Sequence, residues 1–89
     1  MHKFEIKPEL HTKLVKISKK DKTSYEAVMN KIQDIISSED IEHYKNLRYN
    51  MKESKRVHIG HFVLVFCYDK SNNFLSFEDY DHYDNIYTK

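Results

Sequence analysis

The stretch KRVHIGHFVLVFCY, residues 55–68, decides the fold. Most of it is an almost continuous run of β-forming apolar residues, which is typical of a central strand covered on at least one face. The lone glycine, Gly60, indicates a tight turn or a bulge within the run. We therefore expect two antiparallel strands, Lys55–Ile59 and His61–Tyr68.

The residues on either side extend this sheet. The sequence DKSNN at 69–73 has the composition of a turn, so the segment from Phe74 to Glu78 is predicted to return as the second strand of a hairpin. Phe4 and Ile6 alternate with charged neighbours, which favours a short first strand.

Two amphipathic helices are predicted between these strands. Pro8 suits the first turn of a helix that ends near residues 19–21, and its apolar residues recur at helical spacing (Leu10, Leu14 and Ile17). Thr23 and Glu26 match a capping box, with Thr23 as the N-cap of a second helix. An apolar stripe runs along that helix to about Ser37, and it consists of Tyr25, Val28, Met29, Ile32, Ile35 and Ile36.

This order of elements predicts an α+β fold in which an N-terminal helical hairpin packs on a small, mostly antiparallel sheet. Residues 39–53 have no clean period and are expected to form a short helix and a loop. At 89 residues and 10.8 kDa, the chain is the size of a single domain, which we place at residues 1–89.

Composition excludes several classes of protein. The formal charge of +1 argues against a uniformly basic nucleic-acid coat and against an acidic tail protein. Cys67 is the only cysteine, so no intramolecular disulfide forms, and its apolar surroundings predict a buried, inert thiol. No apolar stretch approaches the roughly 20 residues that cross a bilayer, and the N-terminus lacks the apolar core of a signal peptide. We expect a cytoplasmic protein with no membrane partner.

The charge is nevertheless unevenly distributed. Residues 1–59 carry 13 basic and 9 acidic side chains, whereas residues 60–89 carry 2 basic and 5 acidic ones. The basic excess peaks in a patch formed by Lys45, Arg48, Lys52, Lys55 and Arg56, with Tyr44 and Tyr49 interleaved. Such a patch is suited to gripping phosphates and stacking on bases, although a solvated loop would have the same composition.

Three histidines point to a more specific chemistry. His58 and His61 flank Gly60, and a strand returning after the 69–73 turn would bring residues 58–61 and His82 together, with His82 level with His61. Histidine gives or takes a proton near neutral pH, and RNA cleavage by its own 2′-hydroxyl needs a base, an acid and cations for the developing charge. The alternative is that these are surface histidines at strand ends.

A metal site is a further alternative, since the C-terminal segment holds potential ligands (Asp79, Asp81, His82 and Asp84). Their spacing matches neither an EF-hand loop nor an HExxH helix, so we expect no metal. The single glycine cannot build a phosphate-binding loop, and we expect no cofactor.

Three segments of the sequence resemble a known protein family. The segments 47–49, 55–66 and 77–87, in this order after a helical hairpin, resemble the RelE/ParE superfamily of toxins from type II toxin–antitoxin systems. The histidine near the C-terminus is most similar to the YafQ-type branch, whose members are ribosome-dependent mRNA endonucleases.

The resemblance implies a role for each candidate residue. His82 would act as general acid and His61 or His58 as base, and cleavage would leave a 2′,3′-cyclic phosphate and a 5′-hydroxyl without metal. The implied RNA contacts are Lys52, Lys55 and Arg56 on phosphates and Tyr83 or Tyr87 stacked on a base. The implied partners are mRNA on the ribosome and a small cognate antitoxin that wraps the toxin.

Three departures from the family pattern support a different function. Phe62 stands where RelE proper has an arginine, and Tyr83 or Asp81 stands where it has a second, C-terminal arginine. The C-terminal segment is also acidic, at Asp79, Asp81 and Asp84. The alternative is a protein of this fold without nuclease activity, either a ParE-like gyrase inhibitor or a degenerate toxin that acts through antitoxin binding.

Overall fold

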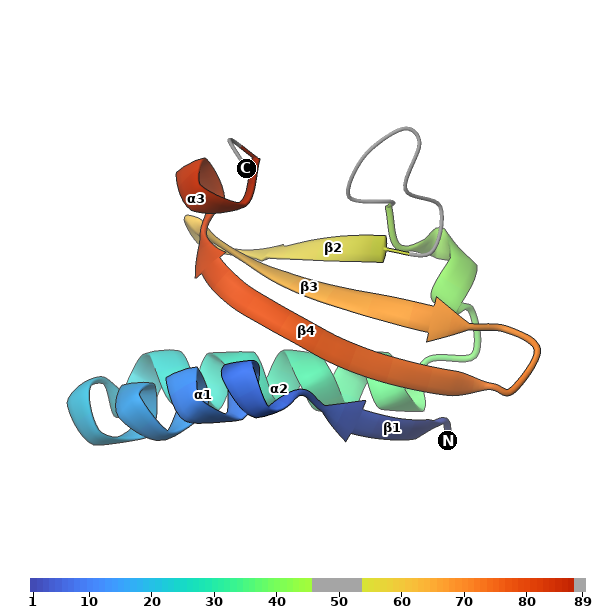
Figure 1. The fold of residues 1–89 in the computed structure, drawn as a ribbon, viewed down its shortest axis with the longest axis horizontal. Coiled ribbons are helices and arrows are strands. Elements are labelled where there is room, and N and C mark those ends of the chain that lie inside the picture. Colours follow the sequence, from blue (N-terminus) through green and yellow to red (C-terminus); the bar gives the residue numbers. More distant parts are fainter. Residues whose placement is uncertain (46–53, 88–89) are drawn as a thin grey trace.

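The structure is a computed structural model of the chain, and it describes residues 1–45 and 54–87. Its elements follow one another as shown in Figure 1. They are β1 (Lys3–Ile6), α1 (Pro8–Lys20), α2 (Lys22–Ser37), the 3-10 turn η1 (Ile41–His43), β2 (Ser54–Ile59), β3 (Phe62–Asp69), β4 (Phe74–His82) and α3 (Tyr83–Tyr87).

The four strands form one sheet in the order β1-β4-β3-β2. The pairs β2–β3 and β3–β4 are antiparallel, and only β1 runs parallel to its neighbour, β4. This confirms the predicted α+β fold with a mostly antiparallel sheet. Gly60 adopts φ +63°, a left-handed conformation that glycine tolerates, and it makes the tight turn between β2 and β3. His61 belongs to that turn, so β3 begins at Phe62 rather than at His61 as predicted.

The two long helices lie side by side under one face of the sheet (Figure 1). Pro8 occupies the first turn of α1 as predicted, where its missing N–H leaves no hydrogen bond unmade. The predicted N-cap of α2 is wrong: the cap is Asp21, whose carboxylate accepts from the backbone N–H of Ser24 at 3.1 Å and from its hydroxyl at 2.6 Å. An aspartate two residues upstream of Thr23 starts the helix earlier, so Thr23 lies inside its first turn.

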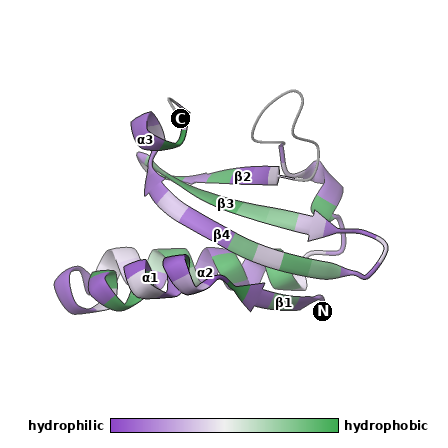
Figure 2. Cartoon of the chain, in the orientation of Figure 1, coloured by the Kyte–Doolittle hydropathy of each residue, from purple (hydrophilic) through white to green (hydrophobic). Residues whose placement is uncertain are grey.

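The main core lies between the helices and the sheet, where apolar residues of both layers meet (Figure 2). Its buried members are Leu10, Leu14, Val28, Ile32, Ile35, Ile36, Ile41, Leu64, Phe66, Leu75, Phe77 and Tyr80. A second, smaller cluster of Val63, Val65 and Ile86 lies on the opposite face, where α3 packs on β3. Alternate residues of β3 thus enter different clusters, which explains its almost continuous apolar sequence.

Several features differ from the expectations. β4 continues beyond Glu78 to His82, because it pairs with the whole length of β3 through a register shift at Val65 and Phe66. The short helix α3 and the parallel pairing of β1 with β4 were not predicted. Cys67 is half-buried rather than buried, and its thiol donates to Oε1 of Glu78 at 3.5 Å.

Part of the predicted basic patch lies outside the described residues. Arg48 and Lys52, together with Tyr49, fall within residues 46–53, which the structure does not describe. Within the described ranges, no helix is both long and apolar enough to span a bilayer.

Candidate functional site

His61 and His82 are brought together at the end of the β3–β4 hairpin. His82 is paired with Phe62 across the sheet, and the backbone N–H of Tyr83 donates to the carbonyl of His61 at 3.0 Å. The two imidazole rings are nearly parallel, with 6.3 Å between their centroids and 20° between their planes. The prediction that the returning strand brings His82 level with His61 is therefore confirmed.

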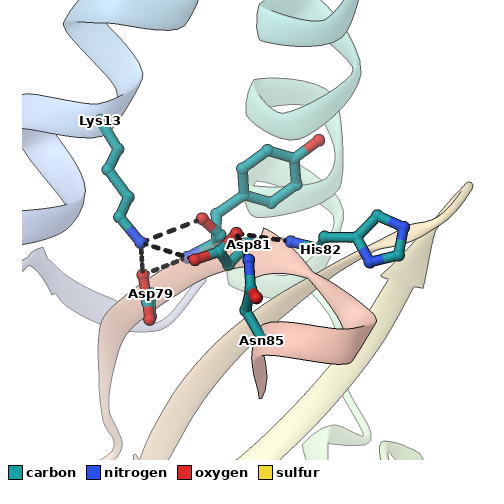
Figure 3. Close-up of polar contacts among 6 residues, drawn as sticks. Lys13, Asp79, Asp81, His82 and Asn85 are labelled. Atoms are coloured by element: carbon teal, nitrogen blue, oxygen red, sulfur yellow. Dashed lines mark hydrogen bonds and ion pairs between the residues drawn. The ribbon is translucent and has the colours of Figure 1, made fainter. Parts of the chain in front are cut away.

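The ring of His82 is held by the residues that follow it. Its Nδ1 accepts a hydrogen bond from the backbone N–H of Asp84 at 3.2 Å and lies 3.6 Å from a carboxylate oxygen of the same residue. Because Nδ1 is the acceptor, the proton of the neutral ring is on Nε2. The backbone N–H of His82 donates to Oδ1 of Asp81 at 2.7 Å, which fixes the main chain at this point (Figure 3).

His58 belongs to a second group, formed with the C-terminal helix. The hydroxyl of Tyr87 lies 3.4 Å from Nε2 of His58, and their rings stack with centroids 6.2 Å apart. The guanidinium carbon of Arg56 lies 5.6 Å from the centroid of the Tyr87 ring. Arg56, His58 and Tyr87 thus form one continuous set of contacts between β2 and α3.

The two histidine groups lie on opposite faces of the sheet. His58 is paired with Val63, which belongs to the cluster under α3, whereas His82 is paired with Phe62. Phe62 lies two residues before Leu64 on β3 and therefore on the same face, and the side chain of Leu64 is in the main core beneath the helices. Since successive side chains of a strand alternate between faces, His58 is on the α3 side and His82 on the helix side.

The neighbouring cations Lys55 and Arg56 are also separated by this alternation. Lys55 is only 4% exposed, and its ammonium donates to the carbonyl of Tyr44 at 3.2 Å and lies 3.9 Å from Glu42. Arg56 is half-buried on the opposite face, beside Tyr87. Two of the predicted phosphate contacts therefore lie on different faces: Lys55 is on the core side of the sheet and Arg56 is on the α3 side. The third, Lys52, is outside the described residues.

Tyr83, the other candidate for base stacking, is exposed at the start of α3. Its ring centroid lies 4.6 Å from that of His82, so it belongs to the His61 and His82 group. Tyr83 and Tyr87 therefore accompany different histidines.

The acidic C-terminal residues are engaged by a lysine of α1 (Figure 3). The ammonium of Lys13 lies 2.6 Å from Oδ1 of Asp79, 3.4 Å from Oδ2 of Asp81 and 3.5 Å from the carbonyl of Tyr80. Burial lowers the pKa of Lys13, but the hydrogen bond and charge of Asp79 and the charge of Asp81 outweigh it, so the pKa is raised. The hydrogen bond from Asn85, helped by the His82 N–H and by Lys13, lowers the pKa of Asp81 against the effect of burial.

This network accounts for residues that the sequence presented as possible metal ligands. Among residues 1–45 and 54–87, no three histidine, cysteine, aspartate or glutamate side chains are grouped so as to hold a metal ion. Asp79 and Asp81 instead attach the far end of β4 to α1.

A groove that was not predicted from the sequence lies beside the His61 and His82 group. A cavity of about 360 Å³ lies between α1, the start of α2 and the ends of β3 and β4. Lys13, Lys16 and Lys20 line it from α1, and Phe62 and Tyr80 from the sheet. The spacing of the three lysines by three and four residues puts them on one helical face, a signal present in the sequence.

Comparisons with known proteins identify relatives over the whole chain. The chain is 46% identical over 90 residues to a protein of Methanocaldococcus jannaschii named "Putative toxin RelE4", covering all of this chain and 94% of that protein. It is 43% identical over 88 residues to an uncharacterized protein of Methanosarcina mazei, covering 98% of this chain and all of the other. No family model matches.

Solved structures share the fold at low sequence identity. The isolated RelE toxin of E. coli superimposes with a TM-score of 0.74 at 13% identity, over 92% of this chain and 84% of that one. The toxin–antitoxin complex RelBE2 of Mycobacterium tuberculosis matches with a TM-score of 0.60 at 12% identity, over 91% and 96%. With a full-length relative at 46% identity and this fold, the chain belongs to the RelE family, the toxins of toxin–antitoxin systems.

Proposed function

We propose that this toxin is a metal-independent endoribonuclease that cleaves mRNA on the ribosome, with His61 and His82 as its acid–base pair. The observation that carries the proposal is the approach of the two rings, 6.3 Å apart at the end of the β3–β4 hairpin. Two imidazoles at this separation reach groups on either side of one phosphodiester.

In the proposed reaction, His61 takes the proton of the 2′-hydroxyl as that oxygen attacks the adjacent phosphorus. His82 gives a proton to the departing 5′-oxygen as the P–O bond breaks. The products are a 2′,3′-cyclic phosphate and a 5′-hydroxyl. The acid in this step is the imidazolium form of His82, which becomes neutral imidazole when Nε2 gives up its proton. A carboxylate oxygen of Asp84 lies 3.6 Å from Nδ1, where it can pair with the imidazolium.

The same geometry favours His61 over His58 as the base. His58 lies on the α3 side of the sheet with Tyr87 and Arg56, whereas His61 faces the ring of His82. We propose that Tyr83 stacks on a base near the reacting phosphate. Arg56, Tyr87 and Lys52 are proposed as RNA contacts outside the acid–base pair. The likeness to the YafQ-type branch rests on these histidines.

The proposed partners are a cognate antitoxin and the translating ribosome in the cytoplasm. The near-neutral formal charge of +1 supports this, because it disfavours tight binding to bulk RNA and leaves the ribosome to present the message.

The test compares single alanine variants in a growth-arrest assay and by primer extension on mRNA bound to programmed ribosomes. His82→Ala and His61→Ala are expected to lower the cleavage rate by about 10²- to 10⁴-fold, the usual contribution of a general acid or base. His58→Ala should have a smaller effect. His11→Ala is the matched control, since His11 is exposed on α1. Wild-type cleavage by a folded His82→Ala protein would refute the assignment.

A second candidate function is favoured by the position of Lys55. Its ammonium is buried against Tyr44, and Phe62 occupies the position of an arginine in RelE proper, so two cations expected near a reacting phosphate are missing. The lack of these cations is expected of a toxin of this fold that has no nuclease activity. Such a toxin would act on gyrase or only through its antitoxin. Accumulation of gyrase–DNA complexes, with no mRNA cleavage at any toxin concentration, would establish it.

A further inference from the structure

The groove between α1 and the ends of β3 and β4 has an aromatic floor. The rings of Phe62 and Tyr80 are nearly parallel, 5.1 Å apart with 19° between their planes. Tyr80 is 6% exposed and therefore supports the stack from the core, whereas Phe62 is 39% exposed. Ile17 adds an apolar wall from α1. An exposed phenylalanine at the rim of the core thus presents a rigid platform on which a flat ring can stack.

The rim of the groove is positively charged. Lys16 and Lys20 are exposed and lie one helical turn apart on α1. Among the described residues, neither ammonium is within ion-pair distance of a carboxylate. The two acidic side chains of the groove are already engaged, Asp21 by Ser24 and Asp81 by Lys13 and Asn85. The groove therefore offers two cations to an anionic ligand.

The groove adjoins the proposed acid–base pair. The ring of Phe62 meets that of His82 edge to face, with 5.7 Å between centroids. A ligand whose phosphate lay between His61 and His82 would place its next residue on Phe62.

We propose that this groove binds one nucleotide of single-stranded RNA next to the cleaved bond, with its base on Phe62 and the phosphates on Lys16 and Lys20. The inference rests on the proposed function, which places RNA at His61 and His82. It adds a second binding subsite in the groove, which Phe62 separates from the histidine pair. Aromatic platforms flanked by cations are the usual means of holding single strands. An acidic peptide would suit the lysines, but the continuity with the histidine pair favours RNA.

The direct test is an NMR titration of the full chain with a short 2′-O-methyl oligouridine, which lacks the attacking hydroxyl. We expect the Phe62 ring and the Ile17 methyl signals to shift together with those of His61 and His82. Phe62→Leu, which keeps an apolar side chain but removes the ring, should weaken binding about tenfold, within the range of one base–aromatic stack. Phe62→Ala should do the same if the protein remains folded.

The charge requirement is tested with two matched double variants. Lys16→Glu with Lys20→Glu should weaken binding and flatten the dependence of log affinity on log salt by about 1.4, the value for two phosphates of a single strand. Lys19→Glu with Lys22→Glu makes the same change of charge at exposed positions outside the groove, and should retain most of the salt dependence.

The outcomes separate this inference from the proposed function. If the oligouridine shifts only signals of His58, Arg56 and Tyr87, the groove is not the subsite, although cleavage dependent on His82 can persist. If the purified antitoxin shifts the groove signals and the oligouridine does not, the groove binds protein and the inference is wrong. Loss of ribosomal cleavage in the Phe62→Leu and Lys16→Glu/Lys20→Glu proteins, with cleavage retained in the control, would support the subsite.

Discussion

The ammonium of Lys13 lies 2.6 Å from Oδ1 of Asp79, which joins the middle of α1 to a part of β4 that lies beyond its pairing with β1. Asp81 takes part through a second contact at 3.4 Å. This network holds the first helix on the strand that carries His82.

Replacing Lys13 is expected to loosen this attachment. Lys13→Met keeps the apolar part of the side chain and removes the charge, so the free energy of unfolding should fall by about 1 kcal/mol, as for a partly exposed ion pair with several partners. Urea unfolding followed by circular dichroism measures the change. Lys16→Met is the control on the same helix, and an equal loss in both variants would contradict the role of Lys13.

The same network should make stability depend on pH. Because folding lowers the pKa of Asp81, its contribution is present above the pKa of the unfolded aspartate, near 3.9, and is lost as the pH falls through the lower folded pKa. Urea unfolding of the wild type and Asp81→Asn from pH 7 to pH 2 should show a difference that disappears at the acid end. A constant difference across this range would show that the carboxylate charge is not responsible.

The start of α2 offers a comparison of two candidate caps. Asp21→Ala removes the acceptor for both the N–H and the hydroxyl of Ser24 and should lower the melting temperature. Thr23→Ala should change it little, since Thr23 is inside the first turn and does not cap the helix. Thermal unfolding of the two variants decides between them, and the opposite order would restore Thr23 as the cap.

The adjacent residues Lys55 and Arg56 should respond differently to alanine. Lys55→Ala leaves the Tyr44 carbonyl without its buried donor and creates a cavity, so we expect a loss of about 2 kcal/mol in the free energy of unfolding. Arg56→Ala removes a contact over the Tyr87 ring and should cost about 0.5–1 kcal/mol. Chemical denaturation of both proteins tests this, and equal losses would mean that the two cations share a role.

Ile86 is the one buried side chain of α3. Ile86→Ala should release α3 from Val63 and Val65, so that amide hydrogens of residues 83–87 exchange rapidly while those of β3 remain protected. Ile86→Val, which removes one methylene, should leave most of the protection. Hydrogen exchange measured by NMR distinguishes this local release from the global destabilisation that would contradict it.

The sequence predicted the parts of the fold that depend on local pattern. Gly60 and the 69–73 segment marked the turns of the three-stranded meander, and Pro8 marked the start of α1. The parallel pairing of Lys3–Ile6 with Phe74–Phe77 was not predictable, because it depends on residues far apart in the chain. The end of β4 at His82 was missed for a similar reason, since the partner strand, rather than local composition, extends it.

The candidate site was predicted in part. The approach of His61 and His82 followed from the antiparallel return of the chain. The separation of His58 from these two residues could not be predicted, because it depends on which residues form the Gly60 turn. A shift of one residue would move every side chain of the strand to the other face of the sheet. The alternation of side chains along β2 also places Lys55 on the core side and Arg56 on the opposite face, although the two residues appear equivalent in a basic run.

The parallel pairing of β1 with β4 also has a consequence for the order in which the molecule assembles. During synthesis, Lys3–Ile6 emerges well before Phe74–Phe77, which lies about 70 residues later in the chain, and its backbone cannot pair until that segment is made. The same late segment supplies Leu75 and Phe77 to the core beneath the helices. The helical hairpin therefore cannot complete its packing when it is made, because the strand that closes both the sheet and the core beneath it follows only after residues 54–69.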